Sequence, residues 1–135
     1  MIESSELILG TVHTWPLKTT TNLKKHYTHL LLNMIKKGQI NILAHPTYLL
    51  GRQIELDKEH IKKIATTASE HNVAIEITST KRVPSENFVG VCYQNDVKFS
   101  IGSDAHRKQD IGEIGWSMNL LEKLGVEDKN IIELI

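Results

Sequence analysis

Four residues of types that bind divalent metals stand at the ends of short apolar runs. They are His13, His45, Asp104 and His106. Imidazole nitrogens and a carboxylate oxygen form the ligand set that suits zinc, manganese or iron. In Asp104-Ala105-His106 alternate side chains point the same way, so both can reach one cluster. A single histidine in such a place is more often a loop or core residue, but four at matched positions favour a metal site.

The apolar runs that precede these residues predict buried β-strands. These runs cover residues 7–12, 40–44 and 97–101, and a further run covers residues 73–77. Each run is largely β-branched or aromatic, as strands are. Nearly continuous apolarity is typical of parallel strands that are covered on both faces. Because the carboxyl ends of parallel strands meet at one edge of a sheet, we expect the four polar residues to share that edge.

Helical patterns separate the strands. An apolar stripe from Leu23 to Ile35 stops at Gly38, and the following helices are expected from Asp57 to Asn72, Ser85 to Gln94, Glu113 to Leu124 and, as a last turn, Asp128 to Leu134. Strands that alternate with helices make parallel βα units with right-handed crossovers. The 135 residues therefore predict one α/β domain, built either as a small open sheet or as half of a (βα) barrel.

Composition excludes several classes of protein. Sixteen Lys and Arg balance sixteen Asp and Glu, so the chain lacks the basic excess of a nucleic-acid-binding protein. The single cysteine, Cys92, cannot form an internal disulfide and is expected to be a small buried hydrophobe. No apolar stretch is long enough to cross a bilayer, and the first ten residues lack a basic signal-peptide region. We expect a soluble cytoplasmic protein.

Other polar residues leave alternatives open. Glu76 interrupts an apolar strand and needs a partner, so it either points into the strand-end cluster or pairs with a nearby base. Lys81 and Arg82 follow that strand and fit phosphate contacts or solvated charges equally well. The remaining histidines fit solvated or helix-terminal positions rather than a site; these are His26, His29, His60 and His71.

At these motifs the chain resembles the PHP family, named for its polymerase and histidinol-phosphatase members. The matching segments are Gly10-Thr11-Val12-His13, Ile42-Leu43-Ala44-His45-Pro46, Ile75-Glu76-Ile77 and, above all, Ile101-Gly102-Ser103-Asp104-Ala105-His106 followed by Ile111-Gly112. The resemblance implies a distorted (βα)7 TIM-like barrel. It also implies a metal-dependent phosphoesterase that hydrolyses a small phosphate monoester by means of a metal-activated water.

Residue by residue, the resemblance implies a site with two or three divalent ions, Zn, Mn or Fe. His13 and His45 would hold one metal, Asp104 a neighbouring one, and His106 that metal or a third. Asp104 and His106 would be the catalytic residues. Apart from the resemblance, the positions of Glu76 and Arg82 make them candidates to hydrogen-bond the metal ligands or to contact the phosphate.

The chain departs from the family pattern in one respect. The family opens with a His-x-His motif, which this sequence lacks, so residues 1–135 look like the C-terminal part of a PHP domain. We therefore expect a homo-oligomer, or completion by an N-terminal half. The alternatives are a catalytically inactive remnant that binds a metal or a partner and, less favoured by the neutral charge, a nuclease module attached to a polymerase. Neither a membrane nor a nucleic acid is expected as a partner.

Overall fold

A parallel β-sheet forms the centre of the protein. The computed structural model describes residues 9–10, 23–49, 52–102 and 114–132. Within them the sheet contains β1 (Leu9–Gly10), β2 (Ile42–Leu43), β5 (Ala74–Thr78) and β6 (Phe99–Gly102), in the order β1-β2-β5-β6. All neighbouring strands are parallel, and each strand pairs with the next strand of this sheet along the chain. The predicted parallel α/β arrangement is confirmed.

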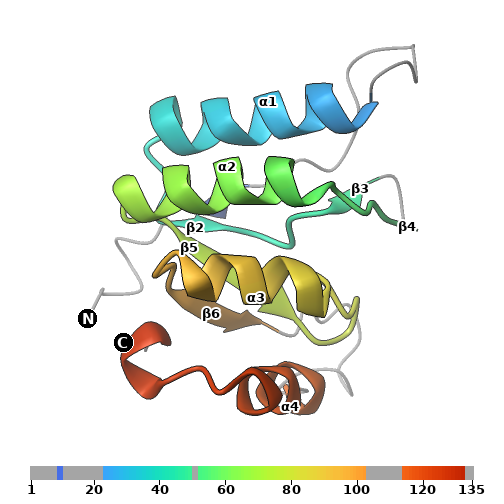
Figure 1. The fold of residues 1–135 in the computed structure, drawn as a ribbon, viewed down its shortest axis with the longest axis vertical. Helices are drawn as coiled ribbons and strands as arrows, with labels where there is room; N and C mark the ends of the chain where they lie inside the picture. Colours follow the sequence, from blue (N-terminus) through green and yellow to red (C-terminus); the bar gives the residue numbers. More distant parts are fainter. Residues whose placement is uncertain (1–8, 11–22, 50–51, 103–113, 133–135) are drawn as a thin grey trace.

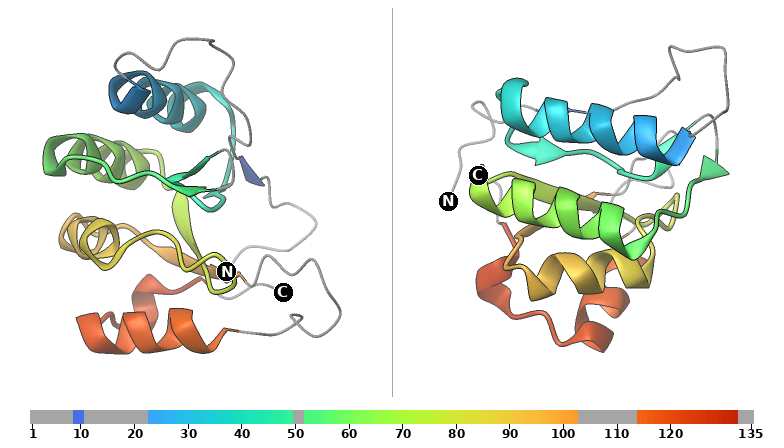
Figure 2. Two further views of the ribbon diagram at one scale, coloured as in Figure 1. Left: turned by 90° about the vertical axis from the view of Figure 1, so that its right-hand side faces the viewer. Right: turned by 45° about the horizontal axis from the view of Figure 1, so that its top comes forward.

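The helices that follow these strands along the chain lie on one side of the sheet (Figures 1 and 2). They are α1 (Leu23–Lys37), α2 (Lys58–Glu70), α3 (Glu86–Gln94) and α4 (Gly115–Leu124). As predicted, Ser85 precedes α3 and its side chain accepts a hydrogen bond from the N–H of Phe88. Gly125 ends α4 in the left-handed region, at φ 71°. Among the described residues, no helix has both the length and the apolarity needed to cross a membrane.

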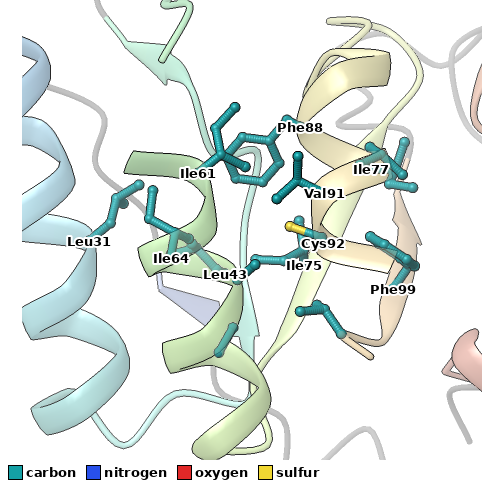
Figure 3. Close-up of a cluster of buried hydrophobic side chains, with 14 of the residues drawn as sticks. Leu31, Leu43, Ile61, Ile64, Ile75, Ile77, Phe88, Val91, Cys92 and Phe99 are labelled. Atoms are coloured by element: carbon teal, nitrogen blue, oxygen red, sulfur yellow. The ribbon is translucent and has the colours of Figure 1, made fainter. Parts of the chain in front are cut away.

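The two faces of the sheet differ in character. Leu43, Ile75 and Phe99 occupy paired positions on adjacent strands and pack, fully buried, in the core cluster with the helices (Figure 3). Side chains alternate along a strand, so Glu76 and its partner Ser100 occupy the opposite face. The helix-facing side is therefore apolar, and the other face carries polar groups toward the carboxyl ends of the strands.

Two features differ from the sequence-based expectation before α2. A short antiparallel hairpin of β3 (Tyr48–Leu49) and β4 (Arg52–Gln53) follows β2 where no strand is predicted. Its strands are too short to show a period-2 pattern. Asp57 does occupy the position before α2, but its side chain makes no capping hydrogen bond.

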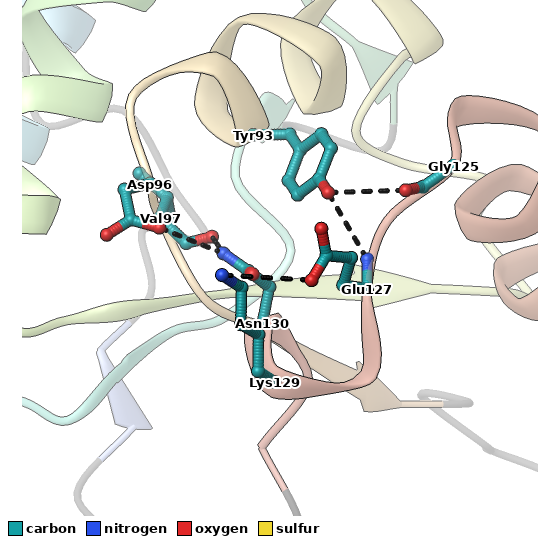
Figure 4. Close-up of polar contacts among 7 residues, drawn as sticks. All are labelled: Tyr93, Asp96, Val97, Gly125, Glu127, Lys129 and Asn130. Carbon is teal, nitrogen blue, oxygen red and sulfur yellow. Dashed lines mark hydrogen bonds and ion pairs between the residues drawn. The ribbon is translucent and has the colours of Figure 1, made fainter.

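The C-terminal segment is the third difference. The predicted last helix is only a 3-10 turn, Asp128–Asn130, after which Ile131 forms a parallel bridge with Phe99 of β6. Residues 133–134 of that predicted helix lie outside the described part. The Asn130 amide donates to Asp96 Oδ1 at 3.3 Å and to the carbonyl of Val97 at 3.4 Å, which turns the chain toward β6 (Figure 4). The segment thus adds a further strand position instead of a helix.

The same segment is also fastened to α3. The Tyr93 hydroxyl donates to the carbonyl of Gly125 at 3.2 Å and accepts from the N–H of Glu127 at 3.3 Å (Figure 4). These contacts hold the chain between α4 and the 3-10 turn against the end of α3. They fix the direction in which Ile131 approaches the sheet.

Candidate functional site

The described part of the structure includes three of the predicted site residues. His45 lies two residues after the end of β2, Glu76 is the third of the five residues of β5, and Arg82 lies in the turn after β5. His45 and Arg82 therefore follow the carboxyl ends of two neighbouring parallel strands, and Glu76 stands one position beyond Ile75, the partner of the last residue of β2. His13, Asp104 and His106 lie outside the described residues.

The turn from His45 to Thr47 is held by side chains from two distant elements. His45 donates its backbone N–H to Glu76 Oε1 at 3.2 Å, and Thr47 donates its N–H to the Tyr27 hydroxyl at 2.7 Å. Both donors are in the left-handed region, with φ 26° for His45 and 71° for Thr47. Non-glycine residues rarely adopt such angles, so these hydrogen bonds fix a turn that would otherwise be unfavourable.

The carboxylate of Glu76 is half-buried, and one of its oxygens accepts two hydrogen bonds. Besides the His45 N–H, its Oε1 accepts a hydrogen bond from the Thr78 hydroxyl at 2.9 Å. Hydrogen bonds that a carboxylate accepts are shorter and stronger than those between neutral groups. Among the described residues this carboxylate forms no ion pair with a base, and its place in a cluster of metal ligands stays a prediction.

An aromatic ring links the His45 turn to the loop after β5. The rings of His45 and Tyr48 meet edge to face, with centroids 5.8 Å apart. Lys81 Nζ lies 5.1 Å from the centroid of the same Tyr48 ring, a cation–π contact. Arg82 is exposed in the same turn. One cationic side chain, Lys81, therefore lies over the ring that packs against the buried His45, and a second, Arg82, belongs to the same turn.

Tyr27 is a site-supporting residue that the sequence does not reveal as such. In the sequence it belongs to the apolar stripe of α1, and it is indeed buried there. Burial raises its pKa to about 12, and the N–H that Thr47 donates opposes part of that rise. The only signal available from sequence is general: a buried tyrosine needs a partner for its hydroxyl.

Two buried serines attach α4 to the same edge of the sheet. The hydroxyls of Ser79 and Ser117 lie 2.7 Å apart, and Ser117 donates its hydroxyl to the carbonyl of Ile77 at 3.2 Å. The backbone N–H of Ser117 donates to Ser79 Oγ, also at 3.2 Å. The loop after β5 and the first turn of α4 are therefore held together at the strand ends.

Two hollows in the described part of the protein bear on the location of the site. The larger, about 590 Å³, lies by the amino ends of β5 and β6, away from His45, with Val73, Asp96 and Lys98 among its lining residues. A smaller one of about 250 Å³ lies by Thr47 and the first turn of α3. The buried hydroxyl of Thr47, which lines it, has no hydrogen-bond partner. Position and chemistry favour the smaller hollow as a neighbour of the candidate site.

His45 is the one predicted metal ligand that lies among the described residues. Among the described residues, no three His, Cys, Asp or Glu side chains gather as a metal site would require. Three of the four predicted ligands lie beyond those residues, so the predicted ligand set stays a prediction. What the described residues supply is one buried imidazole and one carboxylate at adjacent strand ends.

Comparison with known proteins points to a phosphatase function for the relatives. A protein from Vibrio parahaemolyticus named a probable phosphatase is 32% identical over 118 residues, which cover 81% of this chain and 45% of the relative. A probable phosphatase from Aliivibrio fischeri is 32% identical over 118 residues, covering 78% and 44%. A third, from Vibrio vulnificus, is 34% identical over 121 residues, covering 81% and 45%. No known protein-family model matches the chain.

The similarity covers most of this chain but less than half of each relative. The chain spans about 45% of the length of the curated relatives it matches. Their similarity extends over most of this chain, so it covers the α/β unit described above rather than one short motif.

Proposed function

We propose that this chain is a metal-dependent phosphatase of PHP type, or the C-terminal portion of one, which hydrolyses a small phosphate monoester. The observation that carries the proposal is the similarity, over about four fifths of the chain, to proteins named probable phosphatases. The geometry supports it, because His45, Glu76 and the cationic Lys81 and Arg82 stand at the carboxyl ends of adjacent parallel strands.

The proposed metal ligands are His13, His45, Asp104 and His106, which would hold zinc, manganese or iron ions, two or three in a complete site. The residue among them that the structure describes fits this role, because His45 is buried at a strand end and its turn is fixed by a carboxylate. When bound, the ions would neutralise charge on the phosphate and lower the pKa of an attacking water. Asp104 and His106 are the proposed catalytic residues.

The chain's own side chains have further proposed tasks. Arg82 is exposed and Lys81 half-buried beside Tyr48, so both can bind phosphate oxygens at the strand-end edge. A guanidinium group binds two phosphate oxygens at once, whereas an ammonium acts as a point charge. Both would orient the monoester, and the half-buried setting of Lys81 would strengthen its attraction to the anion.

The same proposal covers the type of α/β fold, a barrel segment rather than an open doubly wound sheet. Parallel strands in sequential order, with helices on one face, are typical of a segment of a (βα) barrel wall. An open doubly wound sheet would instead carry helices on both faces. Ile131 beside β6 extends the same order by one position. We therefore interpret residues 1–135 as part of a PHP barrel whose remaining strands come from another chain segment or from a partner.

Metal-dependent hydrolysis and its loss on substitution test this proposal. The wild-type chain should hydrolyse p-nitrophenyl phosphate weakly with added Mn²⁺ or Zn²⁺, and a chelator should abolish the activity. Asp104→Asn should lower metal affinity tenfold or more without changing the melting temperature of the metal-free protein. His29→Asn, an exposed residue of α1, is the matched control and should bind metal as the wild type does. Chelator-resistant activity, or unchanged metal binding by Asp104→Asn, would contradict the proposal.

A second candidate function is a catalytically inactive remnant that binds a metal or a partner. It is favoured by the lack of a His-x-His motif, with which the PHP family opens, in residues 1–135. Calorimetric titration with Mn²⁺ separates the two: binding without turnover favours the remnant, and binding with chelator-sensitive turnover favours the enzyme.

A further inference from the structure

Gly102, at the end of β6, lies against the side chain of Glu76. A Cβ atom at Gly102 would be 2.7 Å from Glu76 Oε2, 2.9 Å from Cδ and 3.3 Å from Cγ, and these are the three nearest atoms. The backbone of Gly102 is not in the left-handed region, so its conformation does not require glycine. The Glu76 carboxylate occupies the space that a Cβ atom at position 102 would need.

The two oxygens of this carboxylate thus face different parts of the site. Oε1 accepts from the N–H of His45 and from the hydroxyl of Thr78, while Oε2 rests against Gly102. Gly102 stands two positions before Asp104 in the sequence. One side chain therefore contacts both the turn that carries His45 and the strand that leads to Asp104.

We propose that Glu76 is a positioning residue, whose carboxylate sets the His45 turn relative to the end of β6 and is the reason for glycine at position 102. Its effect on metal binding rests on the proposed function, because it acts through His45. Its effect on the His45 turn does not, because that effect depends only on the contacts above. Ligands bind a metal tightly only when neighbouring hydrogen bonds hold them in a narrow geometry, which gives such a residue its importance.

A double-mutant cycle tests the contact between Glu76 and Gly102. Gly102→Ala should lower the melting temperature by several degrees, because the new methyl group displaces the carboxylate. In a Glu76→Ala background the same change should be neutral or stabilising, since alanine restricts the unfolded chain more than glycine does. Gly90→Ala in α3 is the matched control, because a Cβ there meets nothing within 4 Å. Its effect should be the same in both backgrounds. An equal effect of Gly102→Ala in both backgrounds would overturn the proposal.

Hydrogen exchange tests the second contact. In Glu76→Ala and in Gly102→Ala, the backbone amide of His45 should exchange at least tenfold faster than in the wild type. The amide of Thr47 is an internal control, because Tyr27 and not Glu76 accepts its hydrogen bond. A general loss of stability would accelerate both amides, whereas loss of positioning accelerates His45 selectively. Unchanged exchange at His45 would overturn the proposal.

Titration with Mn²⁺ connects the positioning to the site. Glu76→Ala should weaken Mn²⁺ binding tenfold or more, and Glu76→Gln should bind nearly as the wild type does, because its amide oxygen still accepts from His45. If Gln and Ala weaken binding equally, Glu76 acts through its charge on the metal and the positioning role is overturned. If the wild type binds no Mn²⁺, the proposed function fails, while the double-mutant cycle and the exchange rates still decide the role of Glu76.

Discussion

The turn after β2 depends on side chains that lie far from it in the sequence. Tyr27 of α1 and Glu76 of β5 each accept one backbone N–H from this turn, the first from Thr47 and the second from His45. Both turn residues have positive φ angles. Because a buried N–H without an acceptor costs free energy, each of these side chains should make a measurable contribution to stability.

Tyr27→Phe tests this at the residue scale. The substitution keeps the ring in the core and removes the acceptor for the Thr47 N–H, so we expect the free energy of unfolding at pH 7 to fall by about 1–2 kcal/mol. Urea denaturation of both proteins measures the difference. Equal stability at pH 7 would show that the hydrogen bond has no net effect.

The pH dependence of that difference is a second part of the same prediction. The pKa of Tyr27 is about 12 in the folded protein and 10.0 in the unfolded chain, so the unfolded state ionises first as the pH rises. The stability supplied by the buried neutral phenol is therefore complete below pH 10 and is lost as the pH rises toward 12. The phenylalanine variant has no such loss, so its deficit should shrink by about 1 kcal/mol at pH 10.5. A deficit that is constant with pH would contradict the assigned pKa.

At the scale of the elements, two helix starts show how a similar sequence signal gives different structures. Ser85 and Asp57 are both favourable residues for the position before a helix. The Ser85 hydroxyl accepts from the N–H of Phe88 at 3.3 Å, whereas the Asp57 carboxylate caps nothing and instead lies 4.0 Å from Lys24. The exposed Asp57 pair is screened by solvent and should contribute little.

A pair of alanine substitutions measures this difference. Ser85→Ala should lower the free energy of unfolding by about 1 kcal/mol, because α3 loses its capping acceptor. Asp57→Ala should have a clearly smaller effect, because no capping hydrogen bond is lost. Thermal unfolding at neutral pH gives both values, and an equal or larger loss in Asp57→Ala would contradict the observed cap geometry.

Local signals account for the parts of the fold that the sequence predicts. β-Branched runs mark β5 and β6, the apolar stripe marks α1, and the residues Ser85 and Gly125 mark the ends of α3 and α4. The hairpin after β2 and the bridge at Ile131 depend on contacts between short segments that carry no periodic pattern. Sequence reasoning therefore misses them.

The candidate site, too, is predicted from the sequence only in part. The rule that ligands collect at carboxyl ends of parallel strands brings His45 and Glu76 to one edge. The partner of Glu76, however, is a backbone N–H, and every residue except proline has one, so residue types cannot identify it. The support from Tyr27 is equally hidden, because the acceptor belongs to a helix and the donor to a turn that follows the next strand.

At the scale of the whole molecule, the sheet has an edge at β1. In the described part of the chain, β1 pairs with β2 on one side and has no partner on the other. A parallel edge strand presents unpaired N–H and C=O groups that favour pairing with another strand. If the proposed barrel section is right, this is where further strands would join.

We therefore predict that the chain self-associates in solution. Light scattering coupled to size-exclusion chromatography at micromolar concentration should give a mass above that of one chain, and dilution should reduce it. Adding a lysine to the edge, as in Gly10→Lys, should favour the monomer, while Lys63→Arg on the exposed face of α2 is the control. A monomer with a cooperative melting transition would show that the isolated chain buries its edge in another way.

The order of the strands also affects how the chain can acquire its structure. Leu9 pairs with Ile42, Ile42 with Ala74, Ile75 with Phe99 and Phe99 with Ile131, so each pairing joins one strand to the next in this sheet. None of these pairings requires the first strand to contact the last. Loop-closure entropy then grows in small steps, and folding can proceed unit by unit as each βα segment leaves the ribosome. Each described βα unit can therefore dock on the unit before it as soon as it has been made.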